Sequence, residues 1–486
     1  MSVLLVPSLN FVSGRPEVYV PYGLLNLVAT AHANAFFDVE VAMFSPAYWA
    51  TQFSSSDAVV DAVVEELEPK QFDAIGFSSV CSSVHYSLSI AERLKQRRPN
   101  IQVIFGGPFV TKLAGEVLSS FSFIDAVFVG EGEPSFASYC KNLLAGRRNP
   151  LLGIPGVVTR TLASTVGIQV DNLDALPVTE DLPAYAAWAR LDLSQNPGKN
   201  FVPVEATRGC PLKCSFCSTK QVWGPKVRRK SASRLSRDIM SAQTSTSANF
   251  FSLIGDNVGV PRNQFLKFCE DLIAADTSFH WACSLKLDRL QASDLDTLWA
   301  AGCRGMFIGV ETATAKTLEL VNKAANLEAE ISNIEHAIAR GFLVETSFII
   351  GFPWETEDEL KATFDLHCRF LSQGGKRSQV GILSPIPGTE IVKDGILEWG
   401  ISPGTFSDDG VPLSQDHVAM ITGCPGLFTH FASYKTPNLS DGVLRSFHGA
   451  AAQVNGLYQR SRVAGKEAGH PFAGRESGRA KIVSPY

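Results

Sequence analysis

The alternation of hydrophobic and polar positions divides the first 145 residues into five repeats of a strand and a helix. Short runs rich in β-branched residues predict the strands, and the helical stretches lie between them. The predicted strands are 3–6, 39–44, 74–77, 103–105 and 126–129. The predicted helices are 22–35, 55–67, 84–97, 110–119 and 134–144. Because each parallel connection needs a crossover helix, the pattern predicts an α/β domain at 1–145 with a doubly wound, Rossmann- or flavodoxin-like parallel sheet.

A second series of strands and helices follows at residues 201–395, after a linker at 146–200 that is rich in Pro, Gly and turn residues. Its predicted strands are 202–207, 250–254, 280–284, 305–310, 343–350 and 380–383. Its predicted helices are 231–243, 261–275, 292–301, 326–340 and 356–372. In βα barrels the functional residues lie at the carboxyl ends of the strands, so we expect the chemistry of this domain there.

The composition is that of a globular protein with two or three domains. The 486 residues are 45% hydrophobic and 19% charged, so the chain can bury large cores and is no disordered scaffold. The net charge of −5 gives no electrostatic footprint for nucleic acid. No apolar run reaches the roughly 18 residues of a membrane helix. We therefore expect neither nucleic acid nor a membrane as a partner.

Three cysteines within eight residues are the strongest chemical signal in the chain. Cys210, Cys214 and Cys217 lie in the run EATRGCPLKCSFCSTK, directly after the first predicted strand of the second series. Three thiolates at this spacing can bind three irons of a 4Fe-4S cluster, whereas an electron-transfer cluster normally has four cysteines. The fourth iron is then left open to a small molecule, which is typical of a catalytic cluster.

Other uses of these thiols fit the sequence less well. A structural zinc site usually has four ligands in paired spacings, but the next Cys or His residues after Cys217 are Cys269 and His280. A disulfide framework is disfavoured because ten cysteines in 486 residues are dilute and no signal peptide is recognised. Most of the other seven cysteines lie in apolar surroundings and are expected to be buried small hydrophobes.

The cysteine run resembles the signature of the radical S-adenosylmethionine (SAM) superfamily, including the aromatic Phe216 before the last cysteine. The resemblance implies a partial (β/α)6 barrel whose strand ends contact SAM. Asp256 and Asn257 end the second strand, where the family holds the methionine amino group of SAM. Glu311, in the run GVET after the fourth strand, resembles the family carboxylate that contacts SAM.

Two further turns carry the same resemblance. Gly351 and Pro353 lie in the run GFPWE after the fifth strand, which is similar to the family's G-x-P-G-E turn with Trp354 in place of the second Gly. Pro385 lies in the run SPIPGT after the sixth strand, which matches a family run near the adenine. Each motif is weak alone, but their order after the cysteine run indicates the barrel.

The first domain, placed ahead of such a barrel, resembles the cobalamin-binding domain of cobalamin-dependent radical SAM enzymes. The runs PYGLLNLVA (21–29), FGGPF (105–109) and VGEGE (129–133) carry this resemblance. Ligands of such sheets bind outside the carboxyl ends of the strands, where small residues let a flat ligand approach the backbone. The residues expected there are Ser78, Ser79, Gly106, Gly107, Gly130, Glu131 and Gly132.

One motif of the cobalamin-binding family is absent. Its D-x-H-x-x-G run supplies a His that ligates cobalt from below, but after the second strand this chain has FSPAYW at 44–49. The domain's histidines are His32 and His85, so we expect the lower face of a cobalamin to be held without His in the usual way. The alternative is a flavodoxin-like domain that has kept these loops without the cofactor.

The resemblance implies three cofactors: a 4Fe-4S cluster, SAM and cobalamin. In the family, the reduced cluster cleaves SAM to a 5′-deoxyadenosyl radical, and methylcobalamin supplies a methyl group to the substrate. We expect a C-methyltransferase acting on a small-molecule or peptide natural product in a reducing cytoplasm, with an external electron donor such as flavodoxin or ferredoxin. Radical rearrangement or cyclisation, and aminocarboxypropyl transfer, are the alternatives. A non-enzymatic iron–sulfur protein would have no use for the SAM contacts.

The C-terminal region gives little chemical information. Residues 396–463 are expected to form a small cap that closes the barrel and shapes the substrate pocket, as such extensions commonly do in the superfamily. For Cys424 and His430, ordinary packing is favoured over a proton relay or an extra cluster ligand. Residues 464–486 are polar and Gly-rich and are expected to be disordered.

The cluster hypothesis predicts the outcome of a single substitution. Cys214→Ala should abolish cluster-based cleavage of SAM because one of three iron ligands is lost. Chromatographic assay of 5′-deoxyadenosine after reduction checks this, and continued formation of the nucleoside by the variant would refute the ligand assignment.

Overall fold

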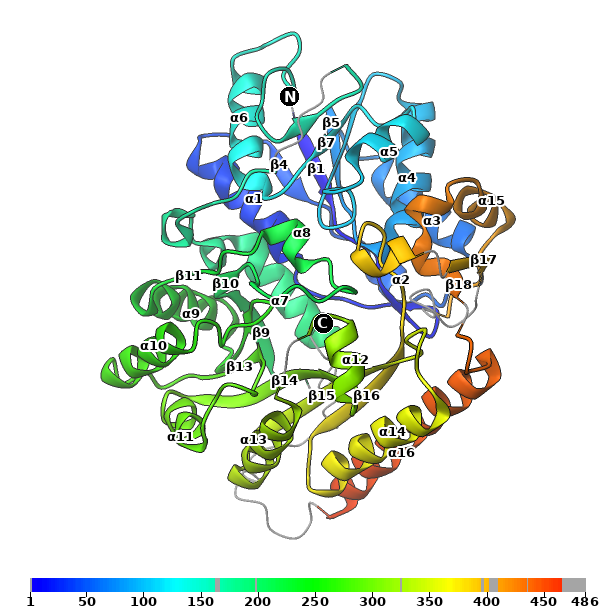
Figure 1. Ribbon diagram of the computed structural model, residues 1–486. Helices are drawn as coiled ribbons and strands as arrows, with labels where there is room; N and C mark the ends of the chain where they lie inside the picture. The colour runs from blue at the N-terminus through cyan, green and yellow to red at the C-terminus, as the bar shows by residue number, and fades with distance from the viewer. Residues whose placement is uncertain are drawn as a thin grey trace. The chain divides into compact units, whose positions relative to one another are not determined.

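The computed structural model describes residues 2–161, 167–196, 199–323, 326–394, 397–401, 410–434 and 436–465. The chain forms two compact units, whose elements are labelled in Figure 1. Unit 1 comprises Met1–Gln195, Phe216–Gly224 and Ser384–Ser433. Unit 2 comprises Asn196–Ser215, Pro225–Leu383 and Tyr434–Tyr486. The tail expected at 464–486 lies outside the described residues, apart from its first two positions.

Unit 1 contains a six-stranded sheet in the order β4-β1-β5-β6-β7-β8. The strands are β1 (Val3–Val6), β4 (Val39–Val41), β5 (Ala74–Ser78), β6 (Gln102–Gly106), β7 (Ala126–Phe128) and β8 (Val157–Val158). All neighbours pair in parallel except β7 and β8, which are antiparallel. The predicted doubly wound sheet is confirmed, with β8 as an additional edge strand. A small hairpin of β2 (Phe11–Val12) and β3 (Arg15–Pro16) follows β1.

Helices cover both faces of this sheet because each carries one apolar stripe. In Figure 1, α1 and α6 lie on one side of the strands and α3, α4 and α5 on the other. In α3, for example, Val59, Val60, Val63, Val64 and Leu67 are buried, and the Ser55 side chain caps the amino end by accepting from Ala58 N at 3.2 Å. The helices are α1 (Tyr22–Ala33), α3 (Ser56–Leu67), α4 (Val84–Arg97), α5 (Ala114–Ser120), α6 (Gly132–Leu144) and α7 (Pro183–Gln195).

The Phe44–Trp49 segment, where a cobalt-binding His would be sought, forms part of the core. Ser45 caps the short helix α2 (Pro46–Ala50), and Phe44, Tyr48 and Trp49 are buried. Their rings pack together, with centroids 4.6 Å apart for Phe44 and Tyr48 and 5.0 Å apart for Tyr48 and Trp49. Residues 39–44 were predicted as one strand, but β4 ends at Val41, so that the chain can turn into this aromatic cluster.

The segment Ser384–Ser433 completes unit 1 from far along the chain. It contains α15 (Gln415–Gly423), in which His417 is buried. The His417 ring hydrogen-bonds with Ser56 Oγ at 2.6 Å and with Ser89 Oγ at 3.0 Å. His417 therefore joins α15 to two helices of the N-terminal sheet domain, and this polar network replaces water for buried hydroxyls.

Unit 2 contains six parallel strands in sequential order, β9-β12-β13-β14-β15-β16. The strands are β9 (Phe201–Glu205), β12 (Phe250–Ile254), β13 (His280–Leu285), β14 (Cys303–Glu311), β15 (Leu343–Ile350) and β16 (Arg377–Ile382). The connecting helices are α9 (Ala232–Thr246), α10 (Arg262–Ala274), α11 (Ala292–Ala300), α12 (Ala315–Leu320), α13 (Leu327–Arg340) and α14 (Glu357–Ser372). The predicted strand–helix repeats are therefore present.

The last helix, α16 (Asp441–Gly465), packs on β16 and α14 (Figure 1). It adds a further covering helix to unit 2. The region expected as a C-terminal cap thus contributes to both units, with α15 in unit 1 and α16 in unit 2. The short elements β17 (Leu397–Ile401) and β18 (Ala432–Tyr434) lie between these helices in the sequence.

A buried ion network supports the beginning of unit 2. Asp238, on α9, is fully buried and accepts from Lys230 Nζ at 2.8 Å and from Arg234 Nε at 2.7 Å. The two cationic side chains are themselves nearly inaccessible. A buried carboxylate needs such partners because desolvation of an isolated charge is costly.

A second buried carboxylate closes the turn after β15. Glu355 Oε2 accepts from Gly351 N at 2.7 Å and from Phe352 N at 2.9 Å. Glu355 Oε1 is buried and accepts no hydrogen bond from any described residue. Burial raises the pKa of the Glu355 carboxyl to about 7, although the two backbone N–H groups oppose the shift. The turn is therefore held by a group that changes charge near neutral pH.

The Asp238 network predicts a large effect on stability. Asp238→Asn should lower the free energy of unfolding by roughly 3–5 kcal/mol, because two buried cations lose their counter-ion. Asp271→Asn is the matched control, since its partner Lys267 forms an exposed pair on α10 and such pairs contribute about 0.2–1 kcal/mol. Denaturant unfolding measures both, and equal effects would contradict the prediction.

Glu355 predicts a pH-dependent stability. Because its pKa is higher in the folded chain (about 7) than the ordinary value of 4.5, the folded state holds the proton longer, and stability falls as pH rises between these values. Glu355→Gln keeps an acceptor for both N–H groups and removes the ionisation. The variant should gain about 1–3 kcal/mol relative to the wild type between pH 5 and pH 8. Thermal unfolding at both pH values checks this, with exposed Glu319→Gln as the control that should show no such gain.

Candidate functional site

The cysteine run begins directly after the first strand of unit 2. The short strand β10 (Thr207–Arg208) and Gly209 lie between that strand and the first cysteine. The φ of Gly209 is 92°, a left-handed conformation that favours glycine. Cys210, Cys214 and Cys217 are half-buried, so their thiols are accessible enough to bind a cluster. By contrast, Cys140, Cys269, Cys283 and Cys303 are buried, as expected of small core residues.

The structure does not draw the three thiols together into a finished metal site. Among the described residues, no three His, Cys, Asp or Glu side chains are grouped closely enough to hold a metal ion. Cys210 and Cys214 belong to unit 2 and Cys217 belongs to unit 1. The donor chemistry fits an iron–sulfur cluster, because three half-exposed thiols stand within eight residues. The ligand assignment stays a prediction that rests on this spacing.

Glu311 lies at the carboxyl end of β14, as predicted. Its backbone has a φ of 71°, and the pairing of β14 with β15 shifts register between Gly309 and Glu311. The side chain is 8% exposed and accepts a hydrogen bond from Lys323 Nζ at 2.6 Å. Lys323 Nζ also donates to the Gly309 carbonyl. The carboxylate is thus held inside the protein by a buried cation.

Lys323 is a site residue that the sequence analysis missed. Burial alone would lower the pKa of its ammonium, but the carboxylates of Glu311 and Glu330 outweigh burial and raise that pKa, and Cys214 acts in the same direction. Burial likewise raises the pKa of Glu330, to about 7. Lys323 lies twelve positions after Glu311, in a turn that belongs to none of the recognised motifs, so no motif in the sequence identifies it.

The end of β12 presents an amide oxygen without an internal partner. Asn257 is 4% exposed, and its Oδ1 accepts no hydrogen bond from any described residue. Thr207 Oγ1, at the end of the neighbouring first strand, is likewise buried and without a described partner. Asp256 is half-buried, and its carbonyl accepts from Ser284 Oγ at 3.4 Å. Orphaned buried oxygens at the ends of two adjacent strands fit a donor group such as the amino group of SAM.

The turn Gly351–Glu355 offers less to a ligand than its motif suggests. The N–H groups of Gly351 and Phe352 are used by Glu355, and Pro353 has none. Trp354 stacks on Phe352, with ring centroids 5.8 Å apart, and its Nε1 donates to Thr317 Oγ1 at 3.0 Å. The N–H groups of Gly351 and Phe352 are therefore not open to a ligand in this structure.

The SPIPGT run, with Pro385, belongs to unit 1 and packs on its own C-terminal neighbours. The Pro385 carbonyl accepts from Thr429 Oγ1 at 2.7 Å, and Ser384 Oγ donates to the His430 carbonyl at 3.2 Å. Phe216, which also belongs to unit 1, is half-buried. The proposed proximity of Pro385 to an adenine stays a prediction.

The strand ends of the N-terminal sheet meet at one edge, as predicted. Ser8, after β1, donates to the Ser78 carbonyl after β5 at 3.2 Å, and Ser79 Oγ donates to the Gly106 carbonyl at 2.7 Å. In the order β4-β1-β5, β1 lies where the direction of winding changes, and ligands of doubly wound sheets bind at this point. The topology therefore fits a cofactor at the ends of β1 and β5.

Two glycines of this edge are explained by the chain itself. A Cβ at Gly107 would lie 2.9 Å from the Ser79 backbone, and a Cβ at Gly130 would lie 2.6 Å from the Ile168 carbonyl. Glu131 N donates to that carbonyl at 2.8 Å, and the Glu131 carboxylate accepts from Val170 N at 3.0 Å. Close backbone packing thus accounts for Gly107 and Gly130. A Cβ at Gly106 would meet no backbone atom closer than 3.9 Å, and a Cβ at Gly132 would lie 3.1 Å from the Leu27 side chain.

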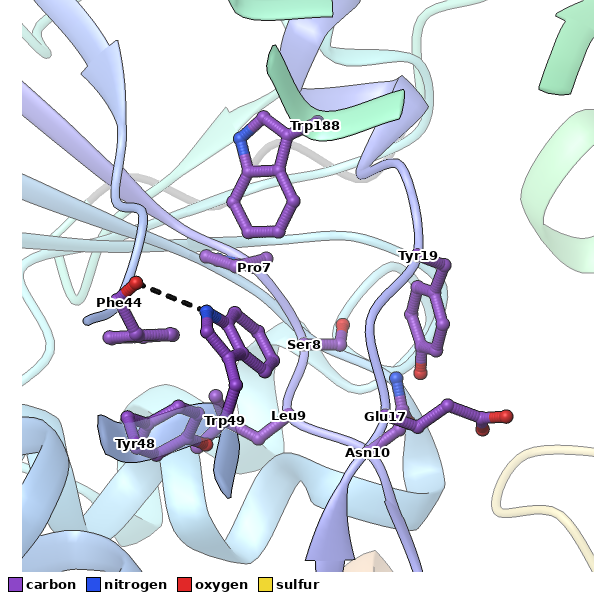
Figure 2. A pocket seen from close by; sticks show the side chains of 10 residues that line it. All are labelled: Pro7, Ser8, Leu9, Asn10, Glu17, Tyr19, Phe44, Tyr48, Trp49 and Trp188. Atoms are coloured by element: carbon purple, nitrogen blue, oxygen red, sulfur yellow. Dashed lines mark hydrogen bonds between the residues drawn. The ribbon is translucent and has the colours of Figure 1, made fainter. Parts of the chain in front are cut away.

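A small pocket opens beside the end of β1. Figure 2 shows the Trp49 and Trp188 rings on either side of Pro7, with Trp49 Nε1 donating to the Phe44 carbonyl at 3.0 Å. Tyr48 also lines it, and its hydroxyl is buried without a described partner. The space is about that of one water molecule. It cannot hold a corrin ring, so a bound cobalamin would lie over the strand ends instead.

Two family models match the chain in the order predicted from the sequence. The model of the B12 binding domain matches residues 15–139, which contain most of the sheet of unit 1. The model of the radical SAM superfamily matches residues 204–367, which contain the cysteine run, Asn257, Glu311 and Lys323. No helix among the described residues is long and apolar enough to cross a membrane.

Known proteins share this arrangement. An uncharacterized methyltransferase of Pyrococcus horikoshii is 25% identical over 68% of this chain and 70% of its own length. An anaerobic magnesium-protoporphyrin IX monomethyl ester cyclase of Rubrivivax gelatinosus is 25% identical over 74% of this chain and 64% of its own. The structure of the radical SAM methyltransferase TsrM from Kitasatospora setae, with cobalamin and a 4Fe-4S cluster bound, has a TM-score of 0.68 at 16% identity over 93% of this chain and 91% of its own.

The cysteine run, the strand-end residues and the two matched domains all support the same identification. The chain belongs to the radical SAM enzymes that carry an N-terminal B12-binding domain.

Proposed function

We propose that this enzyme transfers a methyl group from SAM, by way of cobalamin, to a carbon atom of a small-molecule or peptide substrate. The observation that carries the proposal is the position of Cys210 and Cys214, both half-buried, in the loop that follows the first strand of unit 2. The polar strand ends of β12 and β14 belong to the same edge of that sheet. The proposed metal site and the proposed site for a polar ligand would therefore share one edge.

The chain's own residues have separate tasks in this scheme. Cys210, Cys214 and Cys217 would hold three irons of a 4Fe-4S cluster, and Asn257 and Glu311 would bind the polar groups of SAM. When bound, these cofactors supply reductive cleavage of a sulfonium bond and a cobalt that carries the methyl group. The protein's contribution is to hold the reacting groups at fixed distances and to exclude water.

The residues of unit 1 would hold cobalamin at the ends of β1 and β5. Ser78, Ser79 and the loop Gly106–Gly107 line this edge, and His85, at the start of α4, is buried with both ring nitrogens lacking a described partner. Burial, with His417 and His430 nearby, holds the pKa of His85 well below its ordinary value, so the ring is neutral. Neutral polar groups of the protein could form hydrogen bonds with the amide side chains around a corrin ring.

Methyl transfer and ring closure are the two reactions that the relatives support. The relatives reported above include two methyltransferases and one cyclase, and the same cofactors serve both. Methyl transfer is our first candidate because the similarity to each of the two methyltransferases covers 70% or more of that protein's own length. An external reductant such as flavodoxin or ferredoxin and a reducing cytoplasm complete the proposal.

Labelled SAM distinguishes these reactions without knowledge of the substrate. Protein purified anaerobically should contain about four irons per chain in the cluster and show a corrin absorption band. After reduction, methyl-labelled SAM should transfer its label to the bound cobalamin and release S-adenosylhomocysteine. Formation of 5′-deoxyadenosine without label in the cobalamin would favour ring closure or rearrangement. Colourless protein, or label in methylthioadenosine, would contradict the proposal.

A further inference from the structure

The turn Val321–Lys323 contacts two parts of the proposed site in unit 2 at once. The Val321 carbonyl accepts a hydrogen bond from Ser215 N at 2.8 Å, and Ser215 directly follows Cys214. Two residues later, Lys323 Nζ donates to Glu311 Oε1 at 2.6 Å. The loop that carries the proposed iron ligand and the strand end that carries the proposed SAM ligand are thus tied to one three-residue turn.

The Lys323–Glu311 pair is deeply buried. Lys323 is 7% exposed and Glu311 is 8% exposed. Gly309 makes room for the pair, because a Cβ there would collide with Glu311 Oε1 and would lie 3.2 Å from Lys323 Nζ. The glycine of the GVET run therefore leaves space for the ion pair, and the motif is linked in space to a lysine that is remote in the sequence.

The backbone is strained on both sides of this pair. Glu311 has a φ of 71° and Asn322 has a φ of 54°, and left-handed conformations are uncommon for residues other than glycine. The strand pairing of β14 is also displaced at Glu311. Strained conformations persist where the surrounding structure holds them, and they concentrate at functional sites. Here the strain turns the Glu311 side chain toward Lys323.

A purely structural role would explain these features poorly. A buried ion pair contributes little net stability compared with apolar residues of similar volume, and the two left-handed residues add a further cost. The pair also lies close enough to Cys214 for that side chain to raise the pKa of Lys323. A buried cation that donates to a strand-end carboxylate, from a turn that also bonds the loop next to Cys214, has a more specific use.

We propose that Lys323 is a positioning residue, which holds Glu311 in its SAM-binding orientation while the same turn fixes the Cys214 loop. This inference rests on the proposed function, since it assumes a cluster at the cysteine run and SAM at Glu311. Lys323 acts through Glu311 and touches neither the cluster nor the substrate. Loss of the lysine should therefore weaken SAM binding without preventing cluster assembly.

A double-mutant cycle tests this dependence. Lys323→Met and Glu311→Gln should each weaken SAM binding at least tenfold, as measured by equilibrium dialysis with the anaerobically reconstituted protein. The double variant should bind SAM within about threefold of the weaker single variant, because residues that act as one unit are not additive. Lys323→Arg should recover part of the affinity, since it restores the charge. If the losses of SAM affinity in the two single variants multiply in the double variant, the two residues act independently and the inference is wrong.

Electron paramagnetic resonance of the reduced cluster supplies a readout that a structural role would not move. The variants should keep the wild-type iron content, and Lys323→Met should lose the spectral change that SAM causes in the wild type at the same SAM concentration. Lys230→Met is the matched control, because it removes a buried lysine from the Asp238 network and should lower stability while leaving the SAM-induced change intact.

The outcomes separate this inference from the proposed function. Wild-type protein without a cluster, or with a cluster whose spectrum ignores SAM, would refute the proposed function itself. Wild-type protein that responds to SAM, together with a Lys323→Met variant that binds SAM within twofold of it, would refute only the role of Lys323. If Lys323→Met fails to assemble a cluster while Glu311→Gln assembles one, the lysine is a structural support and the inference is also wrong.

Discussion

Parallel strand direction is the constraint on which the rest of the structure depends. A strand that is joined to its neighbour by a helix must point the same way, so all carboxyl ends in each sheet meet at one edge. In unit 1 this brings Ser8 to Ser78, and in unit 2 it places the loop with Cys210 and Cys214 on the edge that also holds Asn257 and Glu311. Residues separated by a hundred positions can then form one site, and the strands between them only set the spacing.

Buried charge is the second organising feature, and the chain treats it in two ways. Asp238 and Glu311 each accept hydrogen bonds from buried cationic side chains, which replace the water that a buried carboxylate loses. Glu355 has backbone N–H groups as its only described partners, and burial raises its pKa to about 7. The end of β14 therefore has a carboxylate paired with a lysine, whereas the turn after β15 depends on a carboxyl group whose pKa is about 7.

The sequence predicted the fold well because strand and helix patterns are local. The strands of both sheets and the spacing of the three cysteines are visible in short windows, and so is the order of the strand-end motifs. Lys323 could not be predicted, because its partner Glu311 is reached through a turn whose path depends on two left-handed residues. Gly107 and Gly130, which were assigned to a ligand, also have a packing reason to be glycine, because a Cβ at either position would meet the backbone of Ser79 or Ile168; their assignment to a ligand stays a prediction. The contact of His417 with Ser56 and Ser89 likewise joins segments that no periodicity connects.

The composition of unit 1 from three separate stretches of chain has a consequence for biosynthesis. The ribosome delivers the N-terminal sheet first, but α15 and its His417 emerge only after all six strands of the unit 2 sheet have been made. Until then, the helix faces that carry Ser56 and Ser89 lack the segment that buries them. The nascent chain must keep this surface from aggregating throughout the synthesis of the second sheet, and the first unit becomes complete only after that sheet has been made.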